Sequence, residues 1–194
     1  MCEDPDFKRI YEEFQPKIVH YLRRLLGNHD AEDIAQEVFA KVSRGLGGFK
    51  GQSKLSTWIY RIATNTAIDK LRSAPFKRSG ENISLIGEKT VEDRIDSIGD
   101  TDPPLDRKVI RKEMSQCVRE YIDRLSPEHR TVLVLSELEA FKNREIADIL
   151  EISLDNVKVR LHRARACLKK ELDNGCEFYH NEEGILACDR KPCR

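Results

Sequence analysis

The sequence predicts an all-α fold in which two small helical domains are joined by a flexible linker. Hydrophobic residues recur at helical spacing in two separate stretches, a segment rich in glycine, proline and acidic residues lies between them, and no stretch carries a strong strand pattern. At 194 residues with 39% hydrophobic content, the chain is long enough for two such cores. We expect the first domain over 1–73, the linker over 74–105, the second domain over 106–172 and a cysteine-rich tail over 173–194.

Helical spacing predicts the elements of the first domain. An apolar stripe begins at Phe7, is interrupted by Pro16 and closes at Gly27, which predicts a helix pair or one kinked helix. A second helix should follow the N-cap candidate Asp30 and end at a glycine-rich break. A third should begin near Ser56. Its expected buried face is Trp58, Ile59, Ile62, Ala63, Thr66 and Leu71, and its expected outward residues are Tyr60, Arg61, Asn65 and Asp69.

The second domain ends in a predicted helix-turn-helix. Ser126 and Pro127 should start a helix, because serine is a good N-cap and proline suits the first helical position. Two further helices, over 143–150 and from 154 to about 172, are separated by three residues, the length expected inside a helix-turn-helix. The packing side of the last helix should consist of Val157, Leu161, Ala164 and Leu168.

Charge is balanced over the whole chain but concentrated in this last helix. With 34 basic and 34 acidic residues, the net charge alone predicts no nucleic-acid partner. An isolated basic helix face is more often simply solvated, but the short turn and the preceding apolar helix favour entry into a DNA major groove. The residues expected nearest the base edges are Asn156, Lys158, Arg160 and His162.

A loop in the first domain combines an aromatic residue, small flexible residues, hydrogen-bonding groups and two lysines. Its candidate DNA contacts are Phe49, Lys50, Gln52, Ser53 and Lys54. Such a mixture suits an unpaired base, which needs a stacking surface and positive charge along its backbone. The alternative is that the aromatic residues at both ends of the loop are core anchors, the role we expect of Trp58.

Four blocks of sequence, over 30–39, 49–51, 56–65 and 144–165, resemble in order the bacterial extracytoplasmic-function (group four) RNA polymerase sigma factors. The resemblance spans residues 7 to about 172, although the linker is similar to that of the family only in its general character and not in specific residues. It implies that residues 1–73 correspond to sigma region two, which binds polymerase and the minus-ten element. Residues 106–172 correspond to region four, which binds the minus-thirty-five element. Two departures are Glu151, where glycine is common, and the pair Asp155 and Asn156 in place of glycine and threonine.

The resemblance also implies roles for individual residues. Asp33, Gln36 and Glu37 would face the polymerase clamp helices, although Asp33 could simply complement a helix dipole. The loop over 49–55 and Asn65 would capture flipped bases of the minus-ten element. Region four would contact the minus-thirty-five element through Asn156, Lys158, Arg160, His162 and Arg163, with Arg130 and Arg144 holding the DNA backbone or serving as ordinary surface arginines. The acidic linker would thread the RNA exit path of polymerase. No nucleophile, catalytic dyad or phosphate-binding glycine loop is evident, so the chain is not expected to be an enzyme.

The tail carries the candidate metal ligands Cys176, His180, Cys188 and Cys193. Thiolate and imidazole are the usual donors for zinc or cuprous copper, but the spacing is not that of a standard finger, and an unstructured tail is an equal alternative. No cofactor is expected to be required. Some extracytoplasmic-function sigma factors are similar in carrying a cysteine-rich extension that senses metal or redox state. That similarity suggests that Cys176, Cys188 and Cys193 gate polymerase or promoter binding. Cys117 and Cys167 are predicted to be small core residues.

The expected partners are core RNA polymerase and promoter DNA, and an anti-sigma factor is left open. The acidic N-terminus and the lack of a long apolar stretch predict a cytoplasmic protein without membrane insertion. Two alternatives remain at this point. One is a free-standing helix-turn-helix regulator with a cysteine sensor tail, and the weaker one is a metal-binding adaptor with no role at DNA.

Overall fold

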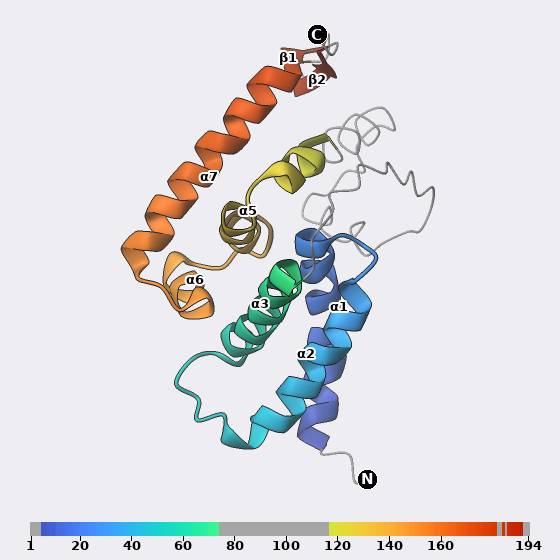
Figure 1. Ribbon diagram of the computed structural model, residues 1–194, viewed down its shortest axis with the longest axis vertical. Helices are drawn as coiled ribbons and strands as arrows, with labels where there is room; N and C mark the ends of the chain where they lie inside the picture. The colour runs from blue at the N-terminus through green and yellow to red at the C-terminus, as the bar shows by residue number, and fades with distance from the viewer. Residues whose placement is uncertain (1–4, 74–116, 182–183, 185, 192–194) are drawn as a thin grey trace.

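The computed structural model describes residues 5–73, 117–181, 184 and 186–191 (Figure 1). The predicted linker over 74–105 and Cys193 lie outside these residues. The helices are α1 (Pro5–Leu26), α2 (Ala31–Gly45), α3 (Leu55–Ser73), α5 (Pro127–Leu133), α6 (Asn143–Leu150) and α7 (Leu154–Gly175). A 3-10 turn, η1 (Leu46–Gly48), follows α2, and a π-helical turn, η3 (Val134–Leu138), follows α5. No helix within the described residues is apolar enough over a sufficient length to cross a bilayer.

The first three helices pack as one bundle. α1 is a single helix, and Pro16 lies within it on the exposed side, where the missing amide donor leaves no buried group unpaired. Gly27 ends α1 in the left-handed region at φ 86°, and its amide donates to the Arg23 carbonyl. Asp30 precedes α2 as predicted, but its side chain makes no capping hydrogen bond and instead lies 3.6 Å from Lys70 of α3.

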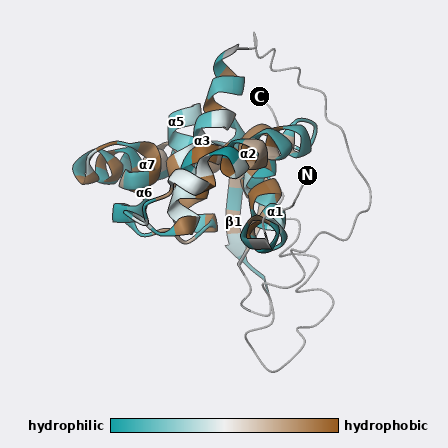
Figure 2. Ribbon diagram, turned by 90° about the horizontal axis from the view of Figure 1, so that it is seen from below, coloured by the Kyte–Doolittle hydropathy of each residue, from teal (hydrophilic) through white to brown (hydrophobic). Residues whose placement is uncertain are grey.

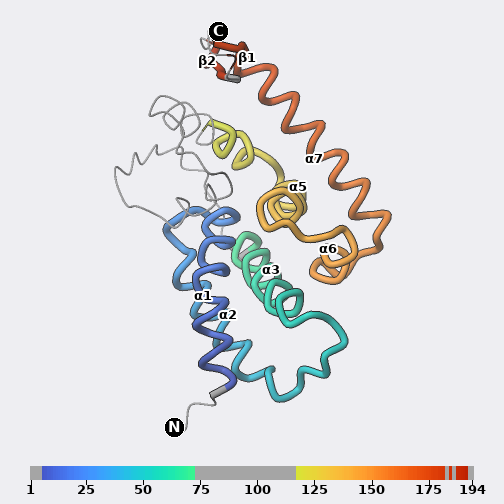
Figure 3. Tube along the Cα trace, turned by 180° about the vertical axis from the view of Figure 1, so that it is seen from behind, coloured from blue at the N-terminus to red at the C-terminus, as the bar shows by residue number. Residues whose placement is uncertain are grey.

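Helix α3 is covered on two sides, which the sequence did not indicate. One side packs on α1 and α2, and the other packs on α6 of the second domain (Figure 3). Tyr60, predicted to face outward, is therefore only 4% exposed, and its ring contacts Phe141 edge-on at 4.7 Å between centroids. The expected outward positions Asn65 and Asp69 are exposed. Trp58 is half-buried and packs against the hydrophobic core, as predicted for an anchor.

The second domain begins, among the described residues, with a helical stretch over 117–124. Ser126 then caps α5 by accepting from the His129 amide, with Pro127 in the first turn, as the sequence predicted. Leu138, at the end of η3, is 40% exposed. The π-helical turn η3 is wider than an α-helical turn and shifts the positions after Val134 away from the apolar stripe of α5.

The tail forms an antiparallel β-hairpin of β1 (Cys176–His180) and β2 (Leu186–Arg190), which the sequence did not indicate, and the two domains themselves are helical as predicted. The strands pair Cys176 with Arg190 and Phe178 with Cys188. Gly184 allows the connection between them, at φ 72°, and its amide donates to the Asn181 carbonyl. This hairpin sits at the far end of α7 from the helix-turn-helix (Figure 1).

Candidate DNA and polymerase interfaces

Helices α6 and α7 form the helix-turn-helix at the predicted positions. Glu145 caps α6 by accepting from the Lys142 amide at 3.0 Å, and Ser153 caps α7 by accepting from the Asn156 amide at 3.2 Å. Between them Glu151 adopts the left-handed conformation at φ 54° and ψ 42°. The turn geometry that glycine would favour is thus reached with a glutamate, at a conformational cost of about 1 kcal/mol.

One side of α7 is buried and the other is exposed, and its ribbon in Figure 2 carries both hydrophobic and hydrophilic residues. Val157, Leu161 and Ala164 are buried, as expected. Of the candidate base contacts, Asn156, Lys158, His162 and Arg163 are exposed, whereas Arg160 is half-buried. Lys158 pairs with Asp155 at 3.1 Å, and Arg160 lies 3.8 Å from Glu128 of α5. These exposed contacts are weak, so they leave the face available for a polyanion.

An aromatic residue of the loop before α3 packs against an aromatic residue of that helix. The rings of Phe49 and Trp58 lie 5.1 Å apart between centroids, and Gly51 holds a left-handed conformation at φ 67°. Lys50 and Gln52 are exposed and Ser53 is half-buried. The loop therefore presents polar and cationic groups next to a fixed aromatic surface.

Two candidate DNA contacts are engaged within the chain. Lys54 of the loop donates to Glu145 of α6 at 2.7 Å, which holds the pKa of that carboxyl below its usual value. Arg130 of α5 donates to the Leu25 carbonyl at 2.9 Å and also to the Asp123 carbonyl. Arg144, by contrast, is exposed on α6.

A buried polar network lies at the same contact between the two domains. Glu139 accepts from Arg24 of α1 at 2.9 Å and from the Tyr60 hydroxyl at 2.7 Å. Burial, followed by the charge of Glu139, raises the pKa of Tyr60 far above its ordinary value, so this hydroxyl stays a donor. Arg61 adds a looser pair with Glu151 at 3.5 Å. The domains are thus joined by hydrogen bonds between ionised groups as well as by apolar packing.

The candidate polymerase contacts share the exposed face of α2. Asp33, Gln36 and Glu37 are all exposed, while Ile34, Ala35 and Val38 beside them are buried in the core. Glu37 pairs with Lys41 one turn later at 2.8 Å. An acidic, amide-bearing strip of helix surface is therefore available to a partner.

The tail residues predicted as metal ligands are only partly brought together. The sulfur atoms of Cys176 and Cys188 converge with that of Cys117, and the three lie within 4.8 Å of one another. His180 is exposed on β1 and is not part of this group. Sequence reasoning missed Cys117 because it lies 59 residues before Cys176 and fits the apolar helix face equally well. Cys167, predicted to be a core residue, is exposed on α7.

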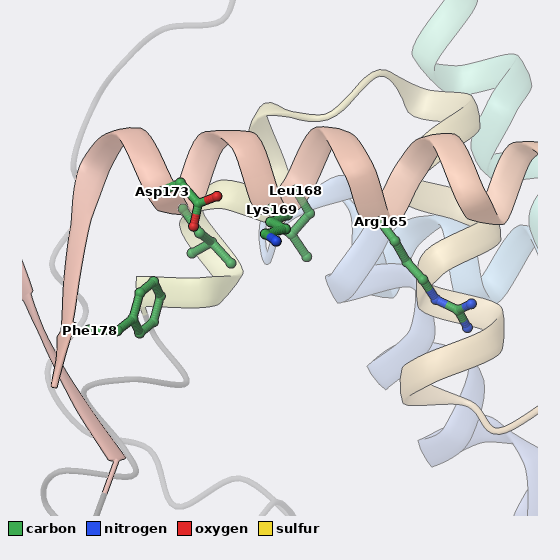
Figure 4. Close-up of a pocket in the computed structure, with 6 residues that line it drawn as sticks. Arg165, Leu168, Lys169, Asp173 and Phe178 are labelled. Carbon is green, nitrogen blue, oxygen red and sulfur yellow. The ribbon is translucent and has the colours of Figure 1, made fainter. Parts of the chain in front are cut away.

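The surroundings of the three thiols are largely apolar. Burial raises the pKa of Cys117 to about 11, helped by its contact with Cys176, and burial also raises the pKa of Cys188. Beside them a shallow pocket opens between α7 and the hairpin, with Phe178 reaching toward the last turns of the helix (Figure 4). The residues that line it are Arg165, Leu168, Lys169, Leu172, Asp173 and Phe178.

Comparison with known proteins identifies both domains. The family described as Sigma-70 region 2 matches residues 10–75, and the family described as Sigma-70, region 4 matches residues 115–168. The chain is 36% identical over 168 residues to the ECF RNA polymerase sigma factor SigW of Bacillus subtilis, covering 86% of this chain and 88% of SigW. It is 30% identical over 166 residues to the ECF RNA polymerase sigma-E factor of Haemophilus influenzae, covering 86% and 87%.

Solved structures share the fold. The sigma factor RpoE in complex with the anti-sigma factor NepR from Bartonella quintana aligns with a TM-score of 0.63 at 21% identity, covering 88% of this chain and 98% of RpoE. CnrH in complex with the cytosolic domain of CnrY aligns with a TM-score of 0.60 at 22% identity, covering 86% and 87%. Because regions 2 and 4 follow each other in the expected order, the chain belongs to the extracytoplasmic-function sigma factors, non-enzymatic initiation factors that direct promoter recognition by RNA polymerase.

Proposed function

We propose that residues 1–73 contact core polymerase and the minus-ten element, and that residues 106–172 contact the minus-thirty-five element. The observation that carries this proposal is the exposed start of α7, held over a packed core by two capped helices. Asn156, Lys158, His162 and Arg163 supply hydrogen-bond donors at this end, the geometry by which a recognition helix contacts base edges. The linker over 74–105 joins the two domains along the RNA exit path.

In the first domain, we assign minus-ten contacts to the loop over 49–55 and to Asn65. The exposed Lys50 and Gln52 beside the Phe49 and Trp58 rings provide charge, hydrogen bonding and a stacking surface for unpaired bases. The polymerase contact is assigned to Asp33, Gln36 and Glu37, because all three are exposed on one face of α2.

The contact between the two domains determines when some of the proposed DNA-binding residues are accessible. Arg130, whose side chain is 14% exposed and donates to the Leu25 carbonyl of the first domain, reaches DNA only after the domains separate, whereas Lys54 is exposed and only weakly paired. Docking on polymerase would supply that separation, and the free chain should therefore bind duplex promoter weakly. An anti-sigma factor is a second proposed partner, by analogy with the NepR complex of RpoE, which has the same fold. Both partnerships place the chain in the cytoplasm.

Gel shift and transcription tests separate this function from that of a free-standing regulator. Promoter DNA should shift strongly only when core polymerase and the chain are both present. Lys158→Ala should weaken promoter binding and initiation, since it removes a charge at the exposed start of α7. Lys17→Ala on α1, which removes an equally solvated lysine, is the matched control. Strong operator-like binding by the chain alone would contradict the proposal.

We also infer that the C-terminal cysteines place initiation under metal or redox control. The support is the convergence of Cys176 and Cys188, residues near the end of the chain, on the end of the recognition helix. Initiation by the protein in which Cys176, Cys188 and Cys193 are changed to serine should no longer respond to zinc, copper or oxidants. An unchanged response would remove this part of the proposal.

A further inference from the structure

Three cysteines from three separate elements meet at the end of α7. Cys117 comes from the helical stretch over 117–124, Cys176 is the first residue of β1, and Cys188 lies in β2. Their sulfur atoms lie within 4.8 Å of one another, and the sulfurs of Cys117 and Cys176 are 3.6 Å apart. The fold therefore brings a cysteine of the helical stretch over 117–124 onto the hairpin that follows α7.

This spacing fits thiolates that share one metal ion. Zinc–sulfur bonds of about 2.3 Å in a tetrahedral arrangement place two sulfur atoms roughly 3.8 Å apart. A disulfide would use two of the sulfurs at about 2 Å and leave the third without a role. Sulfur donors select zinc or cuprous copper over magnesium and calcium, which prefer oxygen ligands.

The surroundings suit a structural metal site. Cys117 and Cys176 are 6% and 2% exposed, and they pack with Tyr121 and the partly buried Leu168 and Leu172. Cys188 is half-buried, so solvent can supply a fourth ligand at its side of the group. Arg190 lies close enough to lower the pKa of Cys117 by its charge, against the larger effect of burial, and it pairs with Glu120 at 2.7 Å. Three thiolates with one Zn²⁺ would carry a net negative charge, and the Arg190 guanidinium lies beside them.

Among the described residues, little apolar burial holds the hairpin in place. The buried cluster between the hairpin, the end of α7 and the 117–124 helix consists of Cys117, Tyr121 and Cys176, and the other described contacts of the hairpin include polar ones at the surface, such as the pair between Arg190 and Glu120. Small elements with so little apolar burial usually depend on a disulfide or a metal for their order. A metal held by all three cysteines would tie the two ends of the second domain together across this thin contact.

We propose that Cys117, Cys176 and Cys188 bind one zinc ion as thiolates and thereby fasten the C-terminal hairpin to the helical stretch over 117–124. The three thiols release three protons to solvent as the metal binds, and no electron is transferred. The site itself stands on the geometry alone. Its consequence, that the bound metal fixes the angle of α7 for promoter contact, rests on the proposed function.

Metal binding by the full-length reduced chain tests the site, with zinc alone as the probe. We expect one zinc per chain, and cobalt substitution should give the absorption bands of thiolate coordination. Replacing a residue that only hydrogen-bonds to a metal ligand lowers metal affinity by roughly 10–100-fold. C117S should weaken zinc binding by more than this, because it removes a ligand. C188S should weaken zinc binding in the same way. Because Cys188 is only half-buried, this variant shows whether the loss in C117S comes from a missing ligand and not from misfolding. C167S, which changes the exposed cysteine of α7, should bind as the unaltered chain does.

The opposite pattern would overturn the proposal. Zinc retained by C117S but lost when His180 and Cys193 are replaced would assign the metal to the tail alone. A chain that binds no zinc and instead forms a Cys117–Cys176 disulfide would make the group a redox pair. Initiation assays with core polymerase keep the two proposals apart. Initiation without zinc binding would refute the site alone, and zinc binding without initiation would refute the proposed function alone.

Discussion

Replacing Glu139 with alanine should open the contact between the two domains. Glu139 accepts hydrogen bonds from Arg24 and from Tyr60, and the side chains of Glu139 and Arg24 are only 9% and 12% exposed. Removing one partner of a buried ion pair costs about 3–5 kcal/mol, because the other charge is left without compensation. Arg24 keeps a hydrogen bond to the Leu138 carbonyl, so the lower end, about 3 kcal/mol, applies here.

That energy corresponds to about a hundredfold shift from the closed toward the open arrangement. Small-angle X-ray scattering of the full chain should show a larger radius of gyration for Glu139→Ala, with helix content unchanged by circular dichroism. Glu137→Ala is the matched control, since that glutamate pairs with Arg165 on the surface, where an ion pair contributes at most about 1 kcal/mol. Equal scattering from the two variants would refute the role assigned to Glu139.

Three other substitutions or conditions give separate tests. Glu151→Gly should stabilise the second domain by about 1 kcal/mol, seen as a higher unfolding midpoint, because glycine carries no penalty in the left-handed turn. Gly175→Ala should destabilise it by about 1–3 kcal/mol in urea titrations, since the added methyl would overlap the Tyr121 hydroxyl. Acidification should weaken the Lys54–Glu145 contact, because the pKa of Glu145 is lower in the folded chain than in the unfolded chain. The stabilisation that this contact gives is therefore fully present above the pKa of the unfolded carboxyl, and it is lost as the pH falls through the pKa of the folded one. Lys54→Met should remove most of this pH dependence, and an unaltered pH profile in that variant would contradict the assignment.

The helices could be predicted from sequence wherever local patterns decide the structure. The bounds of α6 and the start of α7 match the expectation, because the short turn, the capping serine and the apolar spacing all act within a few residues. Asp30 was placed correctly before α2, although its side chain pairs with Lys70 instead of capping the helix. Local sequence signals thus predicted where the helices begin and end, but they did not predict which partners individual side chains bond to.

Features set by distant contacts could not be predicted. Tyr60 is buried because a second domain covers α3, and no periodicity within α3 carries that information. Cys117 looked like an ordinary core residue, and only the folded chain shows its sulfur beside those of Cys176 and Cys188. The hairpin was missed because two five-residue strands flanking a turn carry a weak pattern compared with a 22-residue helix.

Mapping the transcription start sites made by core RNA polymerase with and without this chain tests most directly whether the chain directs promoter recognition. We expect new, discrete start sites that appear only with the chain and share sequence elements at the minus-ten and minus-thirty-five positions. Those starts should weaken with Lys158→Ala and persist with Lys17→Ala. Start sites that are the same with and without the purified chain would contradict a role in promoter recognition.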